Sequence, residues 1–208
     1  MLLAIDTSSA LATAALYHDG ALVCEREADP GKKHAETVMP MIDGLMESCG
    51  AHISQIDLFA VDVGPGSFTG VRIGVSLVNA LAFATGKRVI PIDSLTALAE
   101  STGEREKPVC AMIDARNKNA YAALYQAEKT LIAPCAVEIE AFLARVPAGA
   151  LFAGDAHAGE KTYPRAVWVG KAALARLDTA REEAEPVYLR ASQAERMKKR
   201  ATEETKGQ

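Results

Sequence analysis

The first hundred residues alternate between short apolar runs and polar turns. Three short apolar segments come first and predict strands at residues 2–6, 11–17 and 21–27. Asp19 and Gly20 separate the second segment from the third, and an Asp-Gly pair suits the positive backbone angles of a tight hairpin. We therefore expect the chain to open as an antiparallel meander.

Longer segments follow a break at Asp29-Pro30-Gly31. Apolar residues recur with helical period at residues 34–49, 68–84 and 94–101, and Ser94 is the expected N-cap of the third helix. Residues 58–63 and 88–92 predict buried strands. The resulting order, βββαβαβα, suits a mixed sheet with helices on its faces, as in ribonuclease-H-like and actin-like folds.

An internal sequence repeat indicates that the chain consists of two related halves. Ile5-Asp6 followed by Ala14-Ala15-Leu16-Tyr17 recurs as Ile113-Asp114 followed by Ala122-Ala123-Leu124-Tyr125, and every position has the same offset. Coincidence in an alanine-rich chain is the alternative. The prediction is an α/β, actin-like (ribonuclease-H-like) duplicated fold with two mixed-sheet subdomains at residues 1–103 and 104–190, the second shortened. Residues 191–208 are expected to form a charged tail, helical at first and then disordered.

Two segments carry the residues expected to approach a phosphate or nucleotide. The first is a carboxylate with two hydroxyls at a strand end, and the second is a glycine-rich loop between a strand and a helix, where backbone N–H groups can receive an anion. The alternatives are a self-satisfied Asp-Thr-Ser turn and a tight turn in which serine caps the helix. The candidates are Asp6, Thr7, Ser8, Gly64, Gly66, Ser67, Thr69 and Gly70.

Two other activities need further residues. A two-metal nuclease of ribonuclease-H type needs several converging carboxylates, for which Asp6, Asp62 and Glu36 are the candidates. An actin-like ATPase or kinase acting alone needs a second phosphate loop, and residues 154–159 contain the candidate glycines.

The first two helices are more apolar than packing on one sheet requires, because such packing needs a stripe of only ~100°. We expect both helices to contribute to a subunit interface, with methionines supplying adaptable contacts. Burial beneath the second half is the alternative. The predicted interface residues are Val38, Met41, Ile42, Leu45, Met46, Val71, Val75 and Val78.

Composition limits the classes of function. The 208 residues are 49% hydrophobic and 24% charged, which is enough apolar material for a packed core. A net charge of −4 argues against the chain gripping a nucleic acid alone, and the basic cluster at residues 196–200 is expected to be solvated. The four cysteines form no Cys-x-x-Cys pair, so reduced thiols are expected. With no signal-peptide core and no apolar run of about 20 residues, we expect a cytoplasmic protein without a membrane span.

Several motifs together resemble the bacterial TsaB (YeaZ) family, whose members take part in making threonylcarbamoyladenosine in tRNA. They are Leu3-Ala4-Ile5-Asp6-Thr7-Ser8, His34 ahead of Met39-Pro40, Gly64-Pro65-Gly66-Ser67-Phe68-Thr69-Gly70-Val71-Arg72-Ile73-Gly74, Gly86-Lys87, Asp93-Ser94-Leu95, Asp114-Ala115-Arg116 and Tyr188-Leu189-Arg190. The resemblance is strong over the first 100 residues and thinner beyond them.

The resemblance implies a non-catalytic subunit that supports the transferase TsaD together with the ATPase TsaE and contacts tRNA through the complex. It implies pairing through the first two helices, as a heterodimer with TsaD or as a homodimer. ATP and a metal ion would be used by the partner subunits, and this chain itself would need no cofactor. TsaD carries a His-x-x-x-His metal site where this chain has Pro91-Ile92-Asp93-Ser94-Leu95-Thr96-Ala97-Leu98, without histidine. We therefore expect neither catalytic nor metal-binding residues, and no protease activity.

Overall fold

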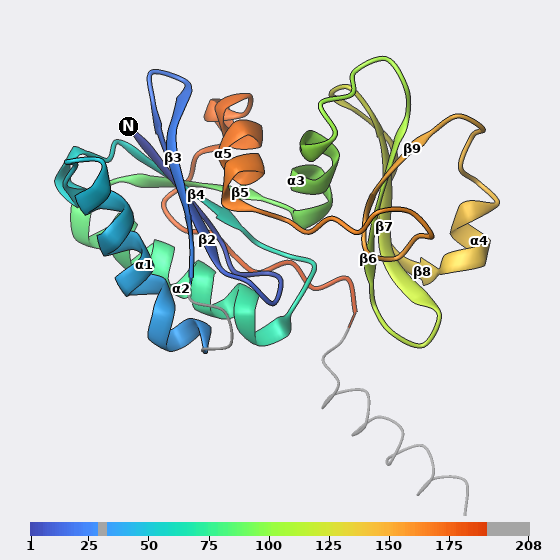
Figure 1. Ribbon diagram of the computed structural model, residues 1–208, viewed down its shortest axis with the longest axis horizontal. Helices are drawn as coiled ribbons and strands as arrows, with labels where there is room; N and C mark the ends of the chain where they lie inside the picture. Colours follow the sequence, from blue (N-terminus) through green and yellow to red (C-terminus); the bar gives the residue numbers. More distant parts are fainter. Residues whose placement is uncertain (29–32, 191–208) are drawn as a thin grey trace, which may run out of the picture.

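The computed structural model describes residues 1–28 and 33–190 as two mixed sheets with helices between and outside them (Figure 1). Sheet A has the strand order β3-β2-β1-β4-β5 and sheet B the order β8-β7-β6-β9. The predicted α/β fold with two mixed-sheet subdomains is confirmed. The predicted break at 29–31, the tail at 191–208 and its basic cluster lie outside the described residues.

Most element bounds agree with the sequence pattern to within two residues. The strands are β1 (Leu2–Asp6), β2 (Thr13–His18), β3 (Ala21–Glu27), β4 (Leu58–Asp62), β5 (Arg88–Ile92), β6 (Val109–Asp114), β7 (Asn119–Gln126), β8 (Lys129–Glu138) and β9 (Leu151–Gly154). The helices are α1 (His34–Ser48), α2 (Phe68–Thr85), α3 (Ser94–Ser101), α4 (Ile139–Leu143) and α5 (Ala166–Leu174), with short 3-10 turns η1 (Ile53–Gln55) and η2 (Leu177–Thr179).

The duplication is visible in strand pairing. In sheet A, β1 pairs antiparallel with β2 and parallel with β4; in sheet B, β6 pairs antiparallel with β7 and parallel with β9. Both Asp6 and Asp114 therefore end a central strand at equivalent places. This agreement favours duplication over coincidence as the origin of the repeated Ile-Asp motif.

Two helices pack across the predicted boundary between residues 103 and 104. α1 and α2 cover one face of sheet A, but the other face is covered by α5, which comes from the second half of the sequence. α3, from the first half, packs on sheet B and also against α5. Figure 1 shows α5 and α3 side by side between the two sheets. The strands of sheet A thus precede residue 104 and those of sheet B follow it, whereas α3 and α5 pack across that point.

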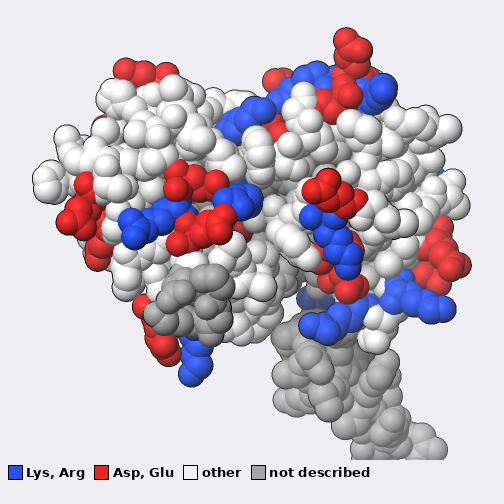
Figure 2. Space-filling view, viewed as in Figure 1, with Lys and Arg blue, Asp and Glu red and all other residues white. Residues whose placement is uncertain are grey.

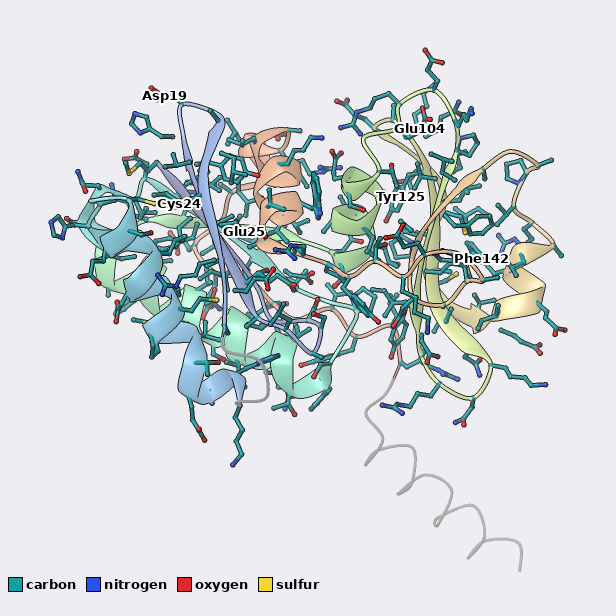
Figure 3. The ribbon with its side chains drawn as sticks, viewed as in Figure 1. Asp19, Cys24, Glu25, Glu104, Tyr125 and Phe142 are labelled. Atoms are coloured by element: carbon teal, nitrogen blue, oxygen red, sulfur yellow. A yellow bond between two sulfur atoms is a disulfide. The ribbon has the colours of Figure 1, made fainter. Side chains whose placement is uncertain are left out.

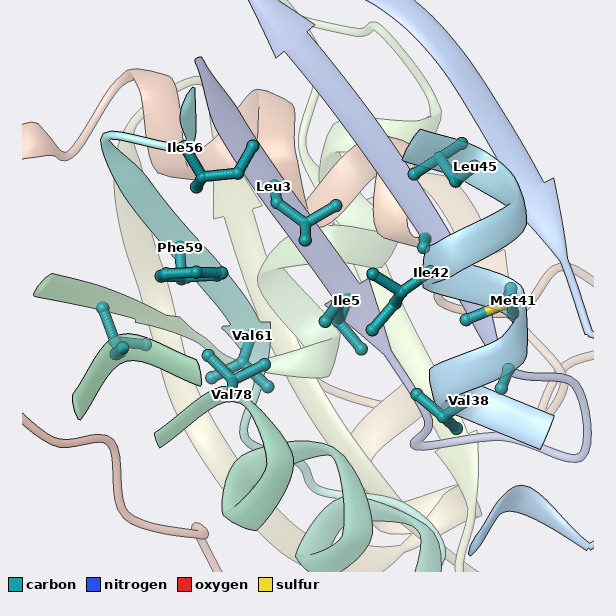
Figure 4. Packing of buried hydrophobic residues seen from close by; sticks show 14 of the residues in the cluster. Leu3, Ile5, Val38, Met41, Ile42, Leu45, Ile56, Phe59, Val61 and Val78 are labelled. Atoms are coloured by element: carbon teal, nitrogen blue, oxygen red, sulfur yellow. The ribbon is translucent and has the colours of Figure 1, made fainter. Parts of the chain in front are cut away.

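The main core lies between sheet A and the α1/α2 layer (Figure 4). Leu3 and Ile5 of β1 point to this side because strand side chains alternate, and Ile42 of α1 and Val78 of α2 meet them there. The alternation sends Leu2 and Ala4 to the opposite face, where α5 packs.

The predicted interface residues belong to this core. All eight have side chains that are at most 6% exposed: Val38, Met41, Ile42, Leu45, Met46, Val71, Val75 and Val78. They pack on sheet A and cannot also contact a partner, so their assignment to an interface is corrected. The residues of α1 and α2 that remain exposed lie on the outer faces of the helices, and they include Met39, Arg72 and Phe83.

Helix α2 is apolar enough to be ambiguous by composition. By length and hydropathy alone it could cross a bilayer, which the sequence analysis did not expect, yet 33% of its residues are buried in the fold. Its buried side lies on sheet A, and Ile73, Leu77 and Leu81 at the margin of that side are partly covered. The apolar residues on its outer side are left without cover by the described part of the chain.

Two helix caps test the local predictions. Ser67 caps α2 as expected, because its Oγ accepts a hydrogen bond from the N–H of Gly70 at 3.2 Å. Ser94 was expected to cap α3, but Asp93 does so by accepting from the N–H of Thr96 at 3.0 Å. Ser94 lies one position inside the helix, and its hydroxyl serves another carboxylate.

A disulfide links β3 to the end of α1, contrary to the expectation of reduced thiols for all four cysteines. Cys24 and Cys49 are bonded across 25 positions of sequence. Figure 3 shows that Cys24 lies on the α1 side of β3, whereas Glu25 lies on the α5 side. Cys110 and Cys135 are free, and burial raises the pKa of the Cys110 thiol to about 12.

Candidate functional site

A cleft of about 510 Å³ lies where the two halves face each other. Ser8, His34 and Ser67 line it from the side of sheet A, and Asp114 and Arg116 line it from the side of sheet B. Its other walls are Ser9, Ala10, Pro65, Gly66, Ile113, Tyr121, Asp155, Thr162, Tyr163 and Pro164. The ends of the two central strands, β1 and β6, therefore meet at this cleft.

The turn after β1 is fixed by hydrogen bonds to the end of β1 and to the segment that begins α2. The N–H of Ser8 donates to Oδ1 of Asp6 at 2.8 Å, and the N–H of Ser67 donates to the carbonyl of Ser8 at 2.7 Å. Thr7 Oγ1 donates to the carbonyl of Gly70 at 2.7 Å. The first turn of α2 and the turn after β1 are thus locked together.

The glycines of the 64–70 loop are explained by this contact. A Cβ on Gly66 would lie 2.5 Å from the carbonyl oxygen of Ser8, and one on Gly70 would lie 2.1 Å from that of Thr7. Gly74, one turn further along α2, would place a Cβ 2.3 Å from Thr7 Oγ1. These glycines let two backbone segments touch, so their presence is not by itself evidence for a bound phosphate.

Behind the cleft wall, Asp62 is a buried acceptor that gathers three donors. Its Oδ1 accepts from the N–H of Gly64 at 2.7 Å and from Ser94 Oγ at 2.6 Å, and its Oδ2 accepts from Ser8 Oγ at 3.2 Å. These bonds tie β4, α3 and the turn after β1 to one side chain.

Asp6 and Asp62 form a buried acidic pair. Burial raises the pKa of both carboxyl groups, and repulsion from Asp6 raises the pKa of Asp62 further, well above its usual value. Oδ2 of Asp6 is buried and, among the described residues, has no hydrogen-bond partner. Both observations favour a pair that keeps a proton, because a proton between the carboxyl groups gives Oδ2 of Asp6 a donor and removes one buried charge.

The structure brings only some of the predicted phosphate-binding residues to the cleft. Ser8, Gly66 and Ser67 line it, whereas Asp6 and Thr7 are fully buried behind the turn. Gly64, Thr69 and Gly70 are not among the lining residues. Phosphate or nucleotide binding by this set stays a prediction.

Sequence reasoning missed the opposite wall of the cleft. Asp114 and Arg116 follow the second copy of the Ile-Asp motif, so the duplication held the signal that could have found them. Residues 116, 117 and 118 all have positive φ, of 64°, 55° and 60°, which L-residues rarely adopt in succession. His34, the first residue of α1, holds the facing turn by donating from Nε2 to the carbonyl of Ser9 at 2.9 Å.

The residues proposed for the two alternative activities do not assemble as those activities require. Glu36, the third nuclease candidate, is a 65% exposed side chain on α1 that pairs with Lys33 at 3.9 Å. In the part of the chain that the structure describes, no three His, Cys, Asp or Glu side chains converge as metal ligands. Gly154, in the candidate second phosphate loop, is required by packing, because a Cβ there would lie 1.9 Å from the carbonyl of Met112.

Comparison with known proteins identifies the family. Residues 28–196 match the family model for TsaD, tRNA N6-adenosine threonylcarbamoyltransferase. TsaB of Haemophilus influenzae is 39% identical over 122 residues, which are 58% of this chain and 51% of that protein. The chain belongs to this family, as a TsaB-type (YeaZ) member.

Other TsaB relatives agree in sequence and structure. TsaB of Escherichia coli is 33% identical over 130 residues, 62% of this chain and 56% of that protein. YeaZ from Pseudomonas aeruginosa superposes with a TM-score of 0.73 at 28% identity, over 90% of this chain and 99% of that one. The chain spans about half the length of the curated TsaB relatives that it matches.

We predict that Gly70→Ala destabilises the fold by ~2–3 kcal/mol, because its methyl group would overlap the carbonyl of Thr7. Gly44→Ala is the matched control in the other long helix. Its methyl group meets only the flexible end of Arg26, so the variant should stay within about 1 kcal/mol of the wild type. Urea unfolding of the three proteins measures both; equal stabilities would contradict the packing role of Gly70.

We predict that the buried acidic pair makes the protein less stable as pH rises. A carboxyl group whose pKa is raised by folding binds its proton more tightly in the folded state, so its stabilising contribution is present at low pH. That contribution is lost between the unfolded value near 3.8 and the raised folded value.

Asp62→Asn should remove this loss, because the amide carries no charge while its oxygen can still accept from Gly64 and Ser94. The gain over the wild type should reach on the order of 1 kcal/mol at pH 8 and shrink toward pH 5. Thermal unfolding across this range measures it. A gain that is the same at every pH would show that the charge of Asp62 is not the cause.

Proposed function

We propose that this chain is a non-catalytic subunit that binds and supports a TsaD-type transferase in forming N6-threonylcarbamoyladenosine in tRNA. The observation that carries the proposal is the exposed apolar side chain of Phe83 on the outer side of α2. Behind the cleft wall, the buried carboxyl group of Asp62 is held by donors of the chain itself. The family membership supports the pathway, since its curated relatives are named as threonylcarbamoyladenosine biosynthesis proteins. We place its action in the cytoplasm, with ATP and metal used by partner subunits.

The residues behind the cleft wall support a structural role for this chain. In the stretch where a TsaD-type enzyme would need metal-binding histidines, Asp93 caps α3 and Ser94 bonds to Asp62. The carboxylate of Asp62 is thereby occupied by donors from the chain itself. These groups stabilise the fold and are not presented to a substrate.

The outer face of α2 supports a partner. Phe83 is 91% exposed, more than any other large hydrophobic side chain in residues 1–28 and 33–190. Ala80 and Ser76, one and two turns before it, are exposed small residues that let another helix approach closely. A large exposed apolar side chain beside small residues suits a contact with another protein, so this face is suited to the TsaD-type partner or, without it, to a second copy of this chain.

An aromatic cluster lies at the other end of the same helix. The guanidinium of Arg72 lies 4.0 Å from the ring centroid of Phe68, and its Nε donates to the hydroxyl of Tyr188 at 2.7 Å. Phe68 and Tyr188 stack with their centroids 4.9 Å apart, and both rings stay partly exposed. Preordered tyrosine and arginine side chains are frequent binding hot spots.

The interface prediction concerns Phe83→Asp. A charge at this position should weaken the complex with the TsaD partner at least tenfold, which corresponds to ~1.4 kcal/mol. Leu131→Asp is the control, because Leu131 is also exposed but lies on β8 of the other subdomain. Calorimetric titration measures both affinities. If both variants bind like the wild type, α2 does not form the interface.

The functional prediction concerns tRNA. Depleting this chain in its own host should lower the threonylcarbamoyladenosine content of tRNA, and the wild-type gene should restore it. Leu131→Asp should restore it as well, and Phe83→Asp should do so poorly. Mass analysis of digested tRNA measures the content; an unchanged content after depletion would contradict the proposed function.

A further inference from the structure

A second cavity, of about 620 Å³, lies next to the cleft and is not explained by the family comparison or by the proposed function. The two spaces share the turn at Ser9 and Ala10 and the loop at residues 162–164. The separate walls of the second cavity are Leu11, Thr13, Ser101, Lys161, Arg165 and Trp168. Its volume lies within the ~300–1,000 Å³ of small-molecule sites.

Aromatic and apolar groups form much of this cavity. Trp168, in the first turn of α5, is partly buried and is the only tryptophan of the chain. Tyr163, in the loop before α5, is 50% exposed. Leu11 and Pro164 add further apolar surface. Such walls suit a flat ring, because aromatic side chains offer a large and rigid contact area.

Arg165, which lines this cavity, is already paired with carboxylates. Arg165 Nη2 pairs with Glu25 Oε2 at 2.9 Å and also with Glu27, which lies two positions further along β3. Two carboxylates therefore outnumber its single positive charge. Its role is to fasten α5 to sheet A, so it is not free to attract an anion.

Lys161 is the cation that remains available at this cavity. Among the described residues it takes part in no ion pair or side-chain hydrogen bond that the structure shows. The hydroxyls around it are engaged: Ser101 Oγ donates to the carbonyl of Leu98, and Thr162 Oγ1 accepts from the N–H of Gly154, both at 2.7 Å. The cavity thus offers flat apolar walls with one unpaired positive charge.

We propose that this cavity binds a planar aromatic ligand that carries an anionic group, the chemistry of a nucleoside monophosphate. The ring lies against Trp168 and Tyr163, and the phosphate is held by Lys161. One lysine suits a single phosphate and not a nucleic-acid strand, which needs a cluster of cations. Figure 2 shows acidic and basic side chains interspersed on the face in view, and the net charge is −4.

The single tryptophan provides a direct test on the full chain. Titration with AMP should change the Trp168 fluorescence saturably. Adenosine and inorganic phosphate, each tested alone, should bind at least tenfold more weakly than AMP. A short single-stranded RNA should bind no more tightly than AMP, because the site offers one cation. RNA that binds more tightly than AMP, or adenosine that binds as well as AMP, would overturn the assigned ligand.

Variants locate the site. Lys161→Ala and Tyr163→Ala should each weaken AMP binding at least tenfold, and calorimetry provides a readout that does not depend on the tryptophan. Both side chains are at the surface, and thermal melts confirm that the variants fold. Arg116→Ala is the matched control in the neighbouring cleft and should leave AMP affinity unchanged. No saturable AMP signal, or a loss with Arg116→Ala and not with Lys161→Ala, would refute the proposal.

Discussion

The fit of the turn after β1 into a notch of glycines is the contact on which the rest of the structure depends. The carbonyls of Thr7 and Ser8 occupy the space where Gly66 and Gly70 would otherwise carry side chains. This contact sets the distance between the first strand of sheet A and the start of α2. Because α2 covers the main core and β1 is the central strand, a poor fit at these glycines would disturb the packing of both α2 and β1.

The same contact decides what the cleft can do. When the turn is seated, the hydroxyl of Ser8 reaches Asp62, and Asp6 is closed off from solvent. Here the chain supplies three donors to Asp62, whereas Oδ2 of Asp6 is buried without a donor among the described residues. The hydrogen bonds to Asp62 therefore stabilise the meeting point of β1, β4 and α3.

The local features of the fold could be predicted from the sequence because they depend on neighbouring residues. Short apolar runs predicted the bounds of β1, β3 and β5, and the place of Ser67 before an apolar helix predicted the cap of α2. The repeated Ile-Asp motif predicted the second sheet. In each case the signal lies within one element or one repeat.

The errors concern choices between distant partners. An apolar arc on α1 shows that Met41 and Leu45 are buried but not whether a sheet or a second protein buries them, and here it is the sheet. Asp93 and Ser94 are both good caps, and the distant carboxylate of Asp62 decides between them. The wall of the cleft formed by Arg116 and the meeting of Cys24 with Cys49 likewise depend on the assembled fold.

The crossing of the helices makes the two halves mutually dependent. One face of sheet A is covered by α5, which follows sheet B in the sequence. One face of sheet B is covered by α3, which precedes sheet B in the sequence. A chain cut in the linker near Gly103 would give two fragments, each carrying a helix that covers the sheet of the other. Such fragments should therefore recover ordered structure only when mixed, which is the behaviour expected of one cooperative unit.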